Sequence, residues 1–231
     1  PKIDHYIGVG HLEVLKNKIL VKMDYQNKTN SKHIDIIVPH DKDLLSKVTK
    51  DRWNPFTDKP IKTISEYCYT MRRVVNSDSS RIDIVRQLAI KHKKIIVFYN
   101  FNYELDILRS MNDTRQFRVA EYNGHLHEDI PKTNNWIYLV QYISGAEAWN
   151  CIETNTIIFY SLNYSYKITV QAAGRIDRLN TPYANLFYYY IKSDSIIDNN
   201  IMRALIDKKD FNEREFLDSK ELSLSREKHR L

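Results

Sequence analysis

The residues best suited to chemistry in this sequence are two arginines, Arg175 and Arg178, which follow Gly174 and stand three positions apart. They belong to the octapeptide QAAGRIDR at residues 171–178. Positions three apart share a helix face, so a helix here would direct both guanidinium groups at one target. A phosphate oxygen suits such a fork. A surface helix with two solvated arginines is the alternative, and the octapeptide alone does not decide between them.

Glycine spacing excludes the common nucleotide-binding loops. The chain of 231 residues has 5 glycines, namely Gly8, Gly10, Gly124, Gly145 and Gly174. A Walker A loop needs the spacing G-x-x-x-x-G-K-[ST], because its backbone N–H groups must approach the phosphates. No two glycines frame such a loop, and the pair near the start lacks the third glycine of a dinucleotide-binding turn. The chain therefore does not hold a nucleotide with a loop of its own.

Composition and charge narrow the class of protein. Hydrophobic residues make up 42% of the chain and charged residues 28%, which is typical of a folded domain. The formal net charge of +6 fits a polyanionic partner. Cys68 and Cys151 lack the spacing of a metal site and are interpreted as reduced, intracellular thiols. No stretch approaches the length of a membrane span, and the start at Pro1 indicates a fragment of a longer protein.

The first part of the chain predicts a mixed extension. Residues 19–25 and 33–38 alternate like strands and, with a polar turn between them, could form a hairpin. Residues 41–50 predict a short helix, and residues 51–60, with two prolines, an irregular connector. Trp53 and Phe56 are expected to anchor that connector by packing.

A regular alternation of helices and strands follows. Helices are predicted over 80–92, 103–111 and 167–178, and strands over 94–101, 117–122, 136–143, 156–161 and 185–191. Such alternation indicates an α/β fold with a mainly parallel central sheet between two helical layers. The predicted organisation is an N-terminal extension at 1–75, the α/β domain at 76–212 and a charged tail at 213–231.

Four polar loops follow the predicted strands. They lie at 100–103, 123–125, 142–150 and 162–166. Ligands gather at the carboxyl ends of strands in parallel sheets, so these loops are expected to converge on one site. Loops are commonly polar, and no single loop would carry this inference. Within the last strand, Tyr188, Tyr189 and Tyr190 could stack on bases, but an alternating strand predicts that at least two of them are core residues.

The order of these segments resembles a known family. The segments KIIVFYNF, EYNGH, VQYISGAEAWN and IIFYSLNYSYKITVQAAGRIDRLNTP are similar to motifs IV, IVa, V, Va and VI of the second RecA-like domain of superfamily 2 helicases. The closest resemblance is to the Swi/Snf-type helicases of bacteriophages and prophages. The segments KDRWNP, MRRVVNSDSSRI and IDNNIMRALIDKKDFNEREF extend it over residues 45–217. Ala148 departs from the glycine expected in motif V.

This resemblance implies the second half of an ATP-dependent helicase or translocase with a RecA-like fold. A first RecA-like domain of the same protein, carrying Walker A and B, would hold ATP and Mg²⁺, and Arg175 and Arg178 would act as arginine fingers. The track would be DNA, contacted through phosphate and sugar, and the protein would be cytoplasmic in a bacterial host, without a membrane partner. The implied nucleotide-binding residues are Gln171, Gly174, Glu147 and Asn150; the implied nucleic-acid contacts are Asn100, Phe101, Asn123, Gly124, Tyr142 and Ser144.

A second hypothesis belongs to another class of protein. A stand-alone nucleic-acid-binding or protein-binding module could keep the fold after losing motor activity. Such a module would have no chemical need for both arginines of motif VI, so the intact QAAGRIDR segment favours the motor.

Overall fold

Six parallel strands form the central sheet of the computed structural model, which describes residues 29–114, 116–144 and 150–219. The spatial order is β1-β8-β7-β4-β6-β5, and every neighbouring pair in it is parallel. The α/β class predicted from the sequence is therefore confirmed. The strands are β1 (Asn30–Val38), β4 (Lys94–Tyr99), β5 (Arg118–Tyr122), β6 (Trp136–Gln141), β7 (Thr156–Phe159) and β8 (Asn185–Ser193).

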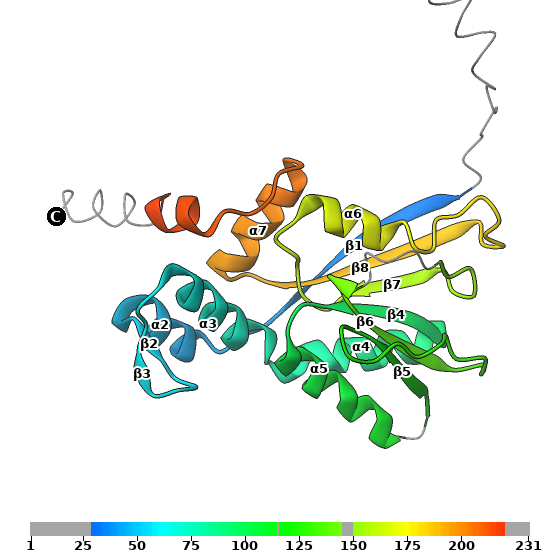
Figure 1. Cartoon of the computed structure of the whole chain (residues 1–231), viewed down its shortest axis with the longest axis horizontal. Coiled ribbons are helices and arrows are strands. Elements are labelled where there is room, and N and C mark those ends of the chain that lie inside the picture. Colours follow the sequence, from blue (N-terminus) through cyan, green and yellow to red (C-terminus); the bar gives the residue numbers. More distant parts are fainter. Residues whose placement is uncertain (1–28, 115, 145–149, 220–231) are drawn as a thin grey trace, which may run out of the picture.

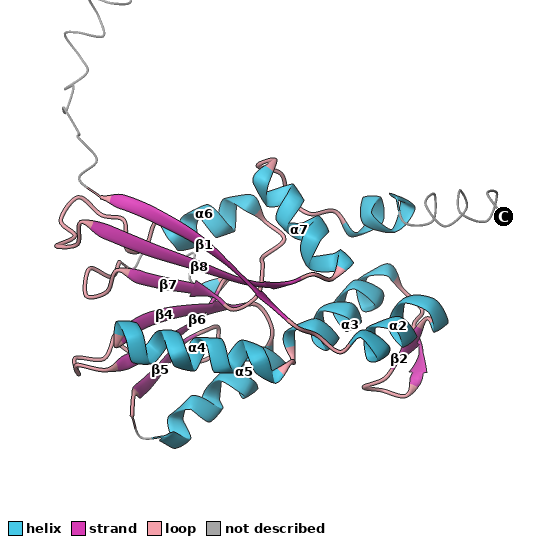
Figure 2. Cartoon of the chain, turned by 180° about the vertical axis from the view of Figure 1, so that it is seen from behind, coloured by secondary structure: helices cyan, strands magenta, loops and turns pink. Residues whose placement is uncertain are grey.

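Helices cover both faces of the sheet, as Figures 1 and 2 show from opposite sides. On one face lie α4 (Ser79–His92) and α5 (Asn102–Arg109), and on the other lies α6 (Tyr166–Ala173). Strand β4 supplies both cores, because Ile95 and Val97 point to the α4 side while Ile96 and Phe98 point to the α6 side. A strand buried on both faces explains the continuous apolar run at 94–99.

A second unit lies beyond the carboxyl ends of the strands. It contains α2 (Lys42–Asp51), the two-residue strands β2 (Trp53–Asn54) and β3 (Lys59–Pro60), and α3 (Ile64–Asn76). Helix α7 (Ile196–Ile206) packs against it, and the shared core includes Tyr67, Met71 and Ile201. Phe216, in the predicted charged tail, is also buried in this core. None of the described helices is long and apolar enough to cross a membrane.

Three expectations about the elements change. The helix expected at 167–178 ends at Ala173, so it contains neither arginine. Helix α3 was not predicted, although Tyr67, Met71 and Val74 have helical spacing and are buried. The strand expected at 33–38 exists as β1, but it pairs in parallel with β8 and so joins the central sheet. Its expected hairpin partner, residues 19–25, lies outside the described residues.

Candidate functional site

The arginine segment leaves helix α6 in a tight turn. The backbone N–H of Gly174 donates to Val170 O at 3.0 Å, and the N–H of Arg175 donates to Ala172 O at 3.2 Å. Ile176 is fully buried in the α6-side core and fixes the turn against the sheet. The two arginines therefore owe their positions to this turn, and the argument from a shared helix face is wrong.

The turn nevertheless places the two arginines close enough for their charges to interact. Arg175 is 7% exposed, and its pKa is lowered first by burial and then by the positive charge of Arg178. Arg178 is half-buried, and its Nε makes no hydrogen bond within the described part of the chain. Two partly buried like charges repel each other, and an anion between them would relieve that repulsion.

The predicted nucleotide-binding residues lie around this turn as far as the structure describes them. The N–H of Cys151 donates to Arg175 O at 3.0 Å, which places the neighbouring, exposed Asn150 near the arginine turn. Gln171 is exposed in the last turn of α6. Glu147 lies outside the described residues.

Two glycines of the predicted sites are not required by the fold. A Cβ placed on Gly174 would meet Val170 O at 3.5 Å and Gln171 O at 3.6 Å, which are ordinary contacts. A Cβ on Gly124 would meet Ser144 Oγ at 3.9 Å. Neither glycine has a positive φ. The described chain therefore gives no internal reason for glycine at either position.

A buried carboxylate holds the strand ends on the other side of the candidate site. Glu104, in the first turn of α5, is 0% exposed. Its Oε2 accepts from Asn100 N at 2.8 Å and from Ser161 Oγ at 2.9 Å, and its Oε1 accepts from Asn76 Nδ2 at 2.9 Å. One side chain thus joins α3, the end of β4 and the segment after β7.

The predicted nucleic-acid residues at these strand ends are largely engaged within the protein. The Asn100 amide donates to Ser161 Oγ at 2.7 Å and accepts from Asn163 Nδ2 at 2.7 Å. The Tyr142 hydroxyl donates to Ser161 O at 3.1 Å, and burial raises the pKa of Tyr142 well above its ordinary value. Phe101 is half-buried and its ring packs on neighbouring aromatic rings.

The turn after β5 brings the remaining predicted contacts together. Asn123 is 5% exposed, and its Oδ1 accepts from the backbone N–H groups of His125 and Leu126, each at 3.0 Å. This bonding shapes the turn and leaves Gly124 exposed at its tip, beside Ser144. Asn123 therefore has a structural role, and its contact with nucleic acid stays a prediction.

Sequence reasoning missed three residues of this region: Arg72 and Tyr69 on α3, and Glu104 on α5. Arg72 is 2% exposed, and its guanidinium donates to Leu162 O and lies 4.7 Å from the centre of the Phe101 ring. The helical spacing in α3 could have revealed the first two as members of a packed helix. The long-range part of the role of Glu104 had no local signal, because its partners Asn76 and Ser161 lie 28 and 57 positions away.

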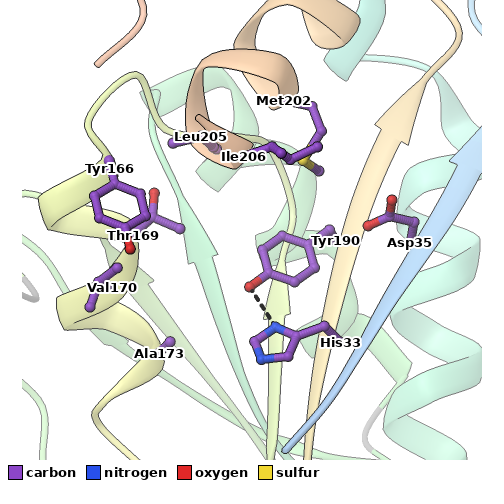
Figure 3. Close-up of a pocket in the computed structure, with 10 residues that line it drawn as sticks. All are labelled: His33, Asp35, Tyr166, Thr169, Val170, Ala173, Tyr190, Met202, Leu205 and Ile206. Carbon is purple, nitrogen blue, oxygen red and sulfur yellow. Dashed lines mark hydrogen bonds between the residues drawn. The ribbon is translucent and has the colours of Figure 1, made fainter. Parts of the chain in front are cut away.

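A separate apolar pocket of about 450 Å³ lies between β1, α6 and α7. Figure 3 shows its lining, where His33 Nδ1 and the Tyr190 hydroxyl are hydrogen-bonded at 3.1 Å. Tyr188 and Tyr189 are 2% and 4% exposed, so the core interpretation of these tyrosines is confirmed. None of the predicted site residues lines this pocket.

The fold has a counterpart among solved structures. The chain superposes on the crystal structure of the C-terminal part of the Fun30 ATPase domain with a TM-score of 0.51 and 15% identity, covering 61% of this chain and 52% of that one. At that identity the likeness concerns the fold alone.

Sequence comparison adds two relatives. The chromatin-remodeling ATPase INO80 of Neosartorya fischeri and that of Aspergillus fumigatus are each 23% identical to this chain, in an alignment of 168 residues that covers 65% of this chain. The chain spans 10% of the length of each of these relatives. No family model matches the sequence. The chain is therefore distantly similar to the C-terminal helicase lobe of Snf2-family ATPases.

Proposed function

We propose that this chain is the second lobe of an ATP-dependent nucleic-acid motor and presents Arg175 and Arg178 to the phosphates of a nucleotide held by a first lobe. The observation that carries the proposal is geometric: the turn after α6 places Arg175, which is 7% exposed, close enough to Arg178 for their positive charges to interact. An anion bound between the two groups would relieve their repulsion. The distant similarity to ATPases makes a polyphosphate the fitting anion.

The residues of the turn fit a triphosphate. Bound ATP with Mg²⁺ would supply the γ-phosphate whose transfer to water drives the motor. The guanidinium groups would donate hydrogen bonds to phosphate oxygens and offset negative charge that develops during transfer. Gly174 would let the phosphates approach the backbone, which explains a glycine that the fold does not require. Gln171, Asn150 and Glu147 would line the same cleft between the lobes.

The nucleic acid would cross the carboxyl ends of the strands. The buried bonding of Asn100, Asn123 and Tyr142 indicates that these residues shape the surface, while Gly124 and Ser144 lie where a backbone can approach. Contacts there would be to phosphate and sugar, so binding should be independent of sequence and should weaken as salt rises. DNA as the track and a phage or prophage source belong to the same proposal and rest on the motif resemblance.

The test is a steady-state ATPase assay on the full-length protein. Arg178→Ala and Arg175→Ala should each lower kcat by about 10³-fold or more, because arginine fingers contribute roughly that much. Arg86→Ala is the matched control, since Arg86 lies exposed on α4 and pairs with Asp83 at 2.6 Å. The control should keep its turnover, and all three variants should keep the wild-type unfolding temperature.

Two results would overturn the proposal. Undiminished nucleic-acid-stimulated turnover in both arginine variants would show that the turn is not part of an ATPase site. A full-length protein with neither a Walker A region nor a partner lobe that has one would favour the binding-module hypothesis.

A further inference from the structure

A groove of about 340 Å³ lies at the carboxyl ends of the strands, between α3 and the strand-end loops. Tyr69 of α3, Phe101 after β4 and Ile143 after β6 supply aromatic and apolar side chains to it. Tyr69 is 39% exposed and Ile143 is 74% exposed. Exposed apolar side chains that gather in one groove offer a surface on which a flat apolar ligand can pack.

The aromatic part of the groove is held rigidly. Phe101 stacks on Tyr103 with ring centres 5.4 Å apart, and it meets Tyr69 edge to face at 5.1 Å. The Arg72 guanidinium lies 4.7 Å from the centre of the Phe101 ring and 4.8 Å from that of Tyr164. These contacts hold the Phe101 ring in place. Tyr69, which packs on its edge, remains 39% exposed and can accept a stacked ligand. A ring fixed in this way loses little entropy when a flat ligand stacks on it.

A carboxylate and a buried guanidinium group both line the groove. Glu213 lines the groove, and its Oε2 accepts from Ser65 Oγ at 2.8 Å. A carboxylate repels a phosphate but accepts hydrogen bonds from the amino group of a base. Beneath the rings, Arg72 is 2% exposed and its Nε makes no hydrogen bond to any described residue. The buried cation thus retains donor capacity at the floor of the groove.

We propose that this groove takes one unstacked nucleobase of the bound strand, stacked between Tyr69 and Ile143 with its edge toward Glu213. The inference rests on the proposed function, which gave the strand-end loops contacts to phosphate and sugar only. It adds a binding site for a base. Bases in a duplex are stacked on one another, so a base enters the groove only from a single strand or a locally opened duplex. The lobe should therefore bind single strands more tightly than a duplex of the same length.

Photocrosslinking tests the position of the base. The 231-residue chain is irradiated with oligodeoxycytidine that carries one 5-iododeoxycytidine, and the crosslinked peptides are identified by mass spectrometry. The proposal expects crosslinks in the α3 peptide that contains Tyr69. Crosslinks confined to other peptides would overturn the base site while leaving the proposed function in place. Absence of any binding to DNA or RNA would overturn both.

Binding measurements with single-site variants test the energetics. Tyr69→Ala should weaken single-strand binding by about 5-fold to 150-fold, the range measured for loss of one base–aromatic stack. Tyr69→Phe should bind like the wild type because it keeps the ring. Ile143→Ala should also weaken binding, whereas Ile206→Ala, which removes a side chain of similar exposure on α7, should not.

Parallel titrations with single-stranded DNA, single-stranded RNA and duplex DNA identify which nucleic acid supplies the base. Tighter binding of either single strand than of duplex, lost in Tyr69→Ala, supports the proposal. The wild type and Tyr69→Ala could instead bind duplex equally, while the variant associates more weakly with the first lobe. That result would assign the groove to a protein side chain and would overturn the proposed base site.

Discussion

Two arginine environments in this protein show opposite solutions to burying a positive charge. Arg81 of α4 is 0% exposed, and its Nη2 donates to Asp198 Oδ2 at 2.8 Å. Its other donors reach the carbonyl oxygens of Val75, Tyr160 and Ile191 at 3.2, 2.7 and 2.9 Å. Arg178, by contrast, has an Nε without an acceptor among the described residues, and its charge acts on Arg175.

The difference separates a structural arginine from a candidate catalytic one. Arg81 joins the ends of α3, β7 and β8 to α7, and its charge is neutralised where it lies. The arginine turn places two like charges near each other, and Arg178 Nε has no acceptor among the described residues. Burial alone does not identify a functional arginine. The useful observation is whether the surrounding protein already satisfies the charge.

Replacing Arg81 gives the strongest test of the difference between a structural and a candidate catalytic arginine. Arg81→Ala leaves the Asp198 carboxylate, which is 2% exposed, without its cation. The free energy of unfolding should fall by about 3–5 kcal/mol, as expected when one partner of a buried ion pair is lost. Urea denaturation followed by circular dichroism measures it. Arg178→Ala in the same assay should change stability by no more than about 0.5 kcal/mol, and an equal loss in both variants would remove the distinction.

A smaller effect is expected at the carboxylate that holds the strand ends. Glu104→Gln removes a charge that accepts from Asn100, Ser161 and Asn76, so the free energy of unfolding should fall by about 1–3 kcal/mol. Asp106→Asn is the control on the same helix, because its pair with Arg109 is exposed and contributes little. Thermal melts of both variants measure the difference in stability. Matching melting temperatures would show that Glu104 does not organise these loops.

The smallest stability effect, and the most selective one, is expected at Gly174. Gly174→Ala should leave the free energy of unfolding within about 1 kcal/mol of wild type, because the added Cβ meets only ordinary contacts and φ is −66°. ATP turnover of the full-length variant should nevertheless fall at least about tenfold, because the methyl group would occupy the space proposed for the phosphates. Normal turnover in a stable Gly174→Ala protein would show that nothing approaches the backbone there.

Much of the fold could be predicted because its signals are local. The apolar runs at 94–99 and 136–141 identified two central strands, and the alternation of strands with α4, α5 and α6 indicated a parallel sheet. Helix α3 was missed although Tyr67, Met71 and Val74 have helical spacing, whereas the early end of α6 depends on tertiary packing. The buried Ile176 turns the chain onto the sheet where local propensity would have continued a helix.

The candidate site was predicted only in part, for the same reason. The motif order identified the loops, and the structure places Asn150 next to the turn that contains Arg175 and Gly124 beside Ser144. The internal bonding of Asn100 and Tyr142 could not be foreseen, because both reach Ser161, which is 61 and 19 positions away. Arg72 contacts the same serine, 89 positions away.

The sequence by itself determined the class of fold, the absence of a Walker A loop and the two arginines of the QAAGRIDR segment, since these depend on residue type and spacing. The tertiary structure alone decided which charges are satisfied. Arg81 meets Asp198 across 117 positions, while Arg175 and Arg178 meet each other in a turn. Desolvation and charge pairing depend on what long-range packing places around a group, and the spacing of residues along a chain does not contain that information.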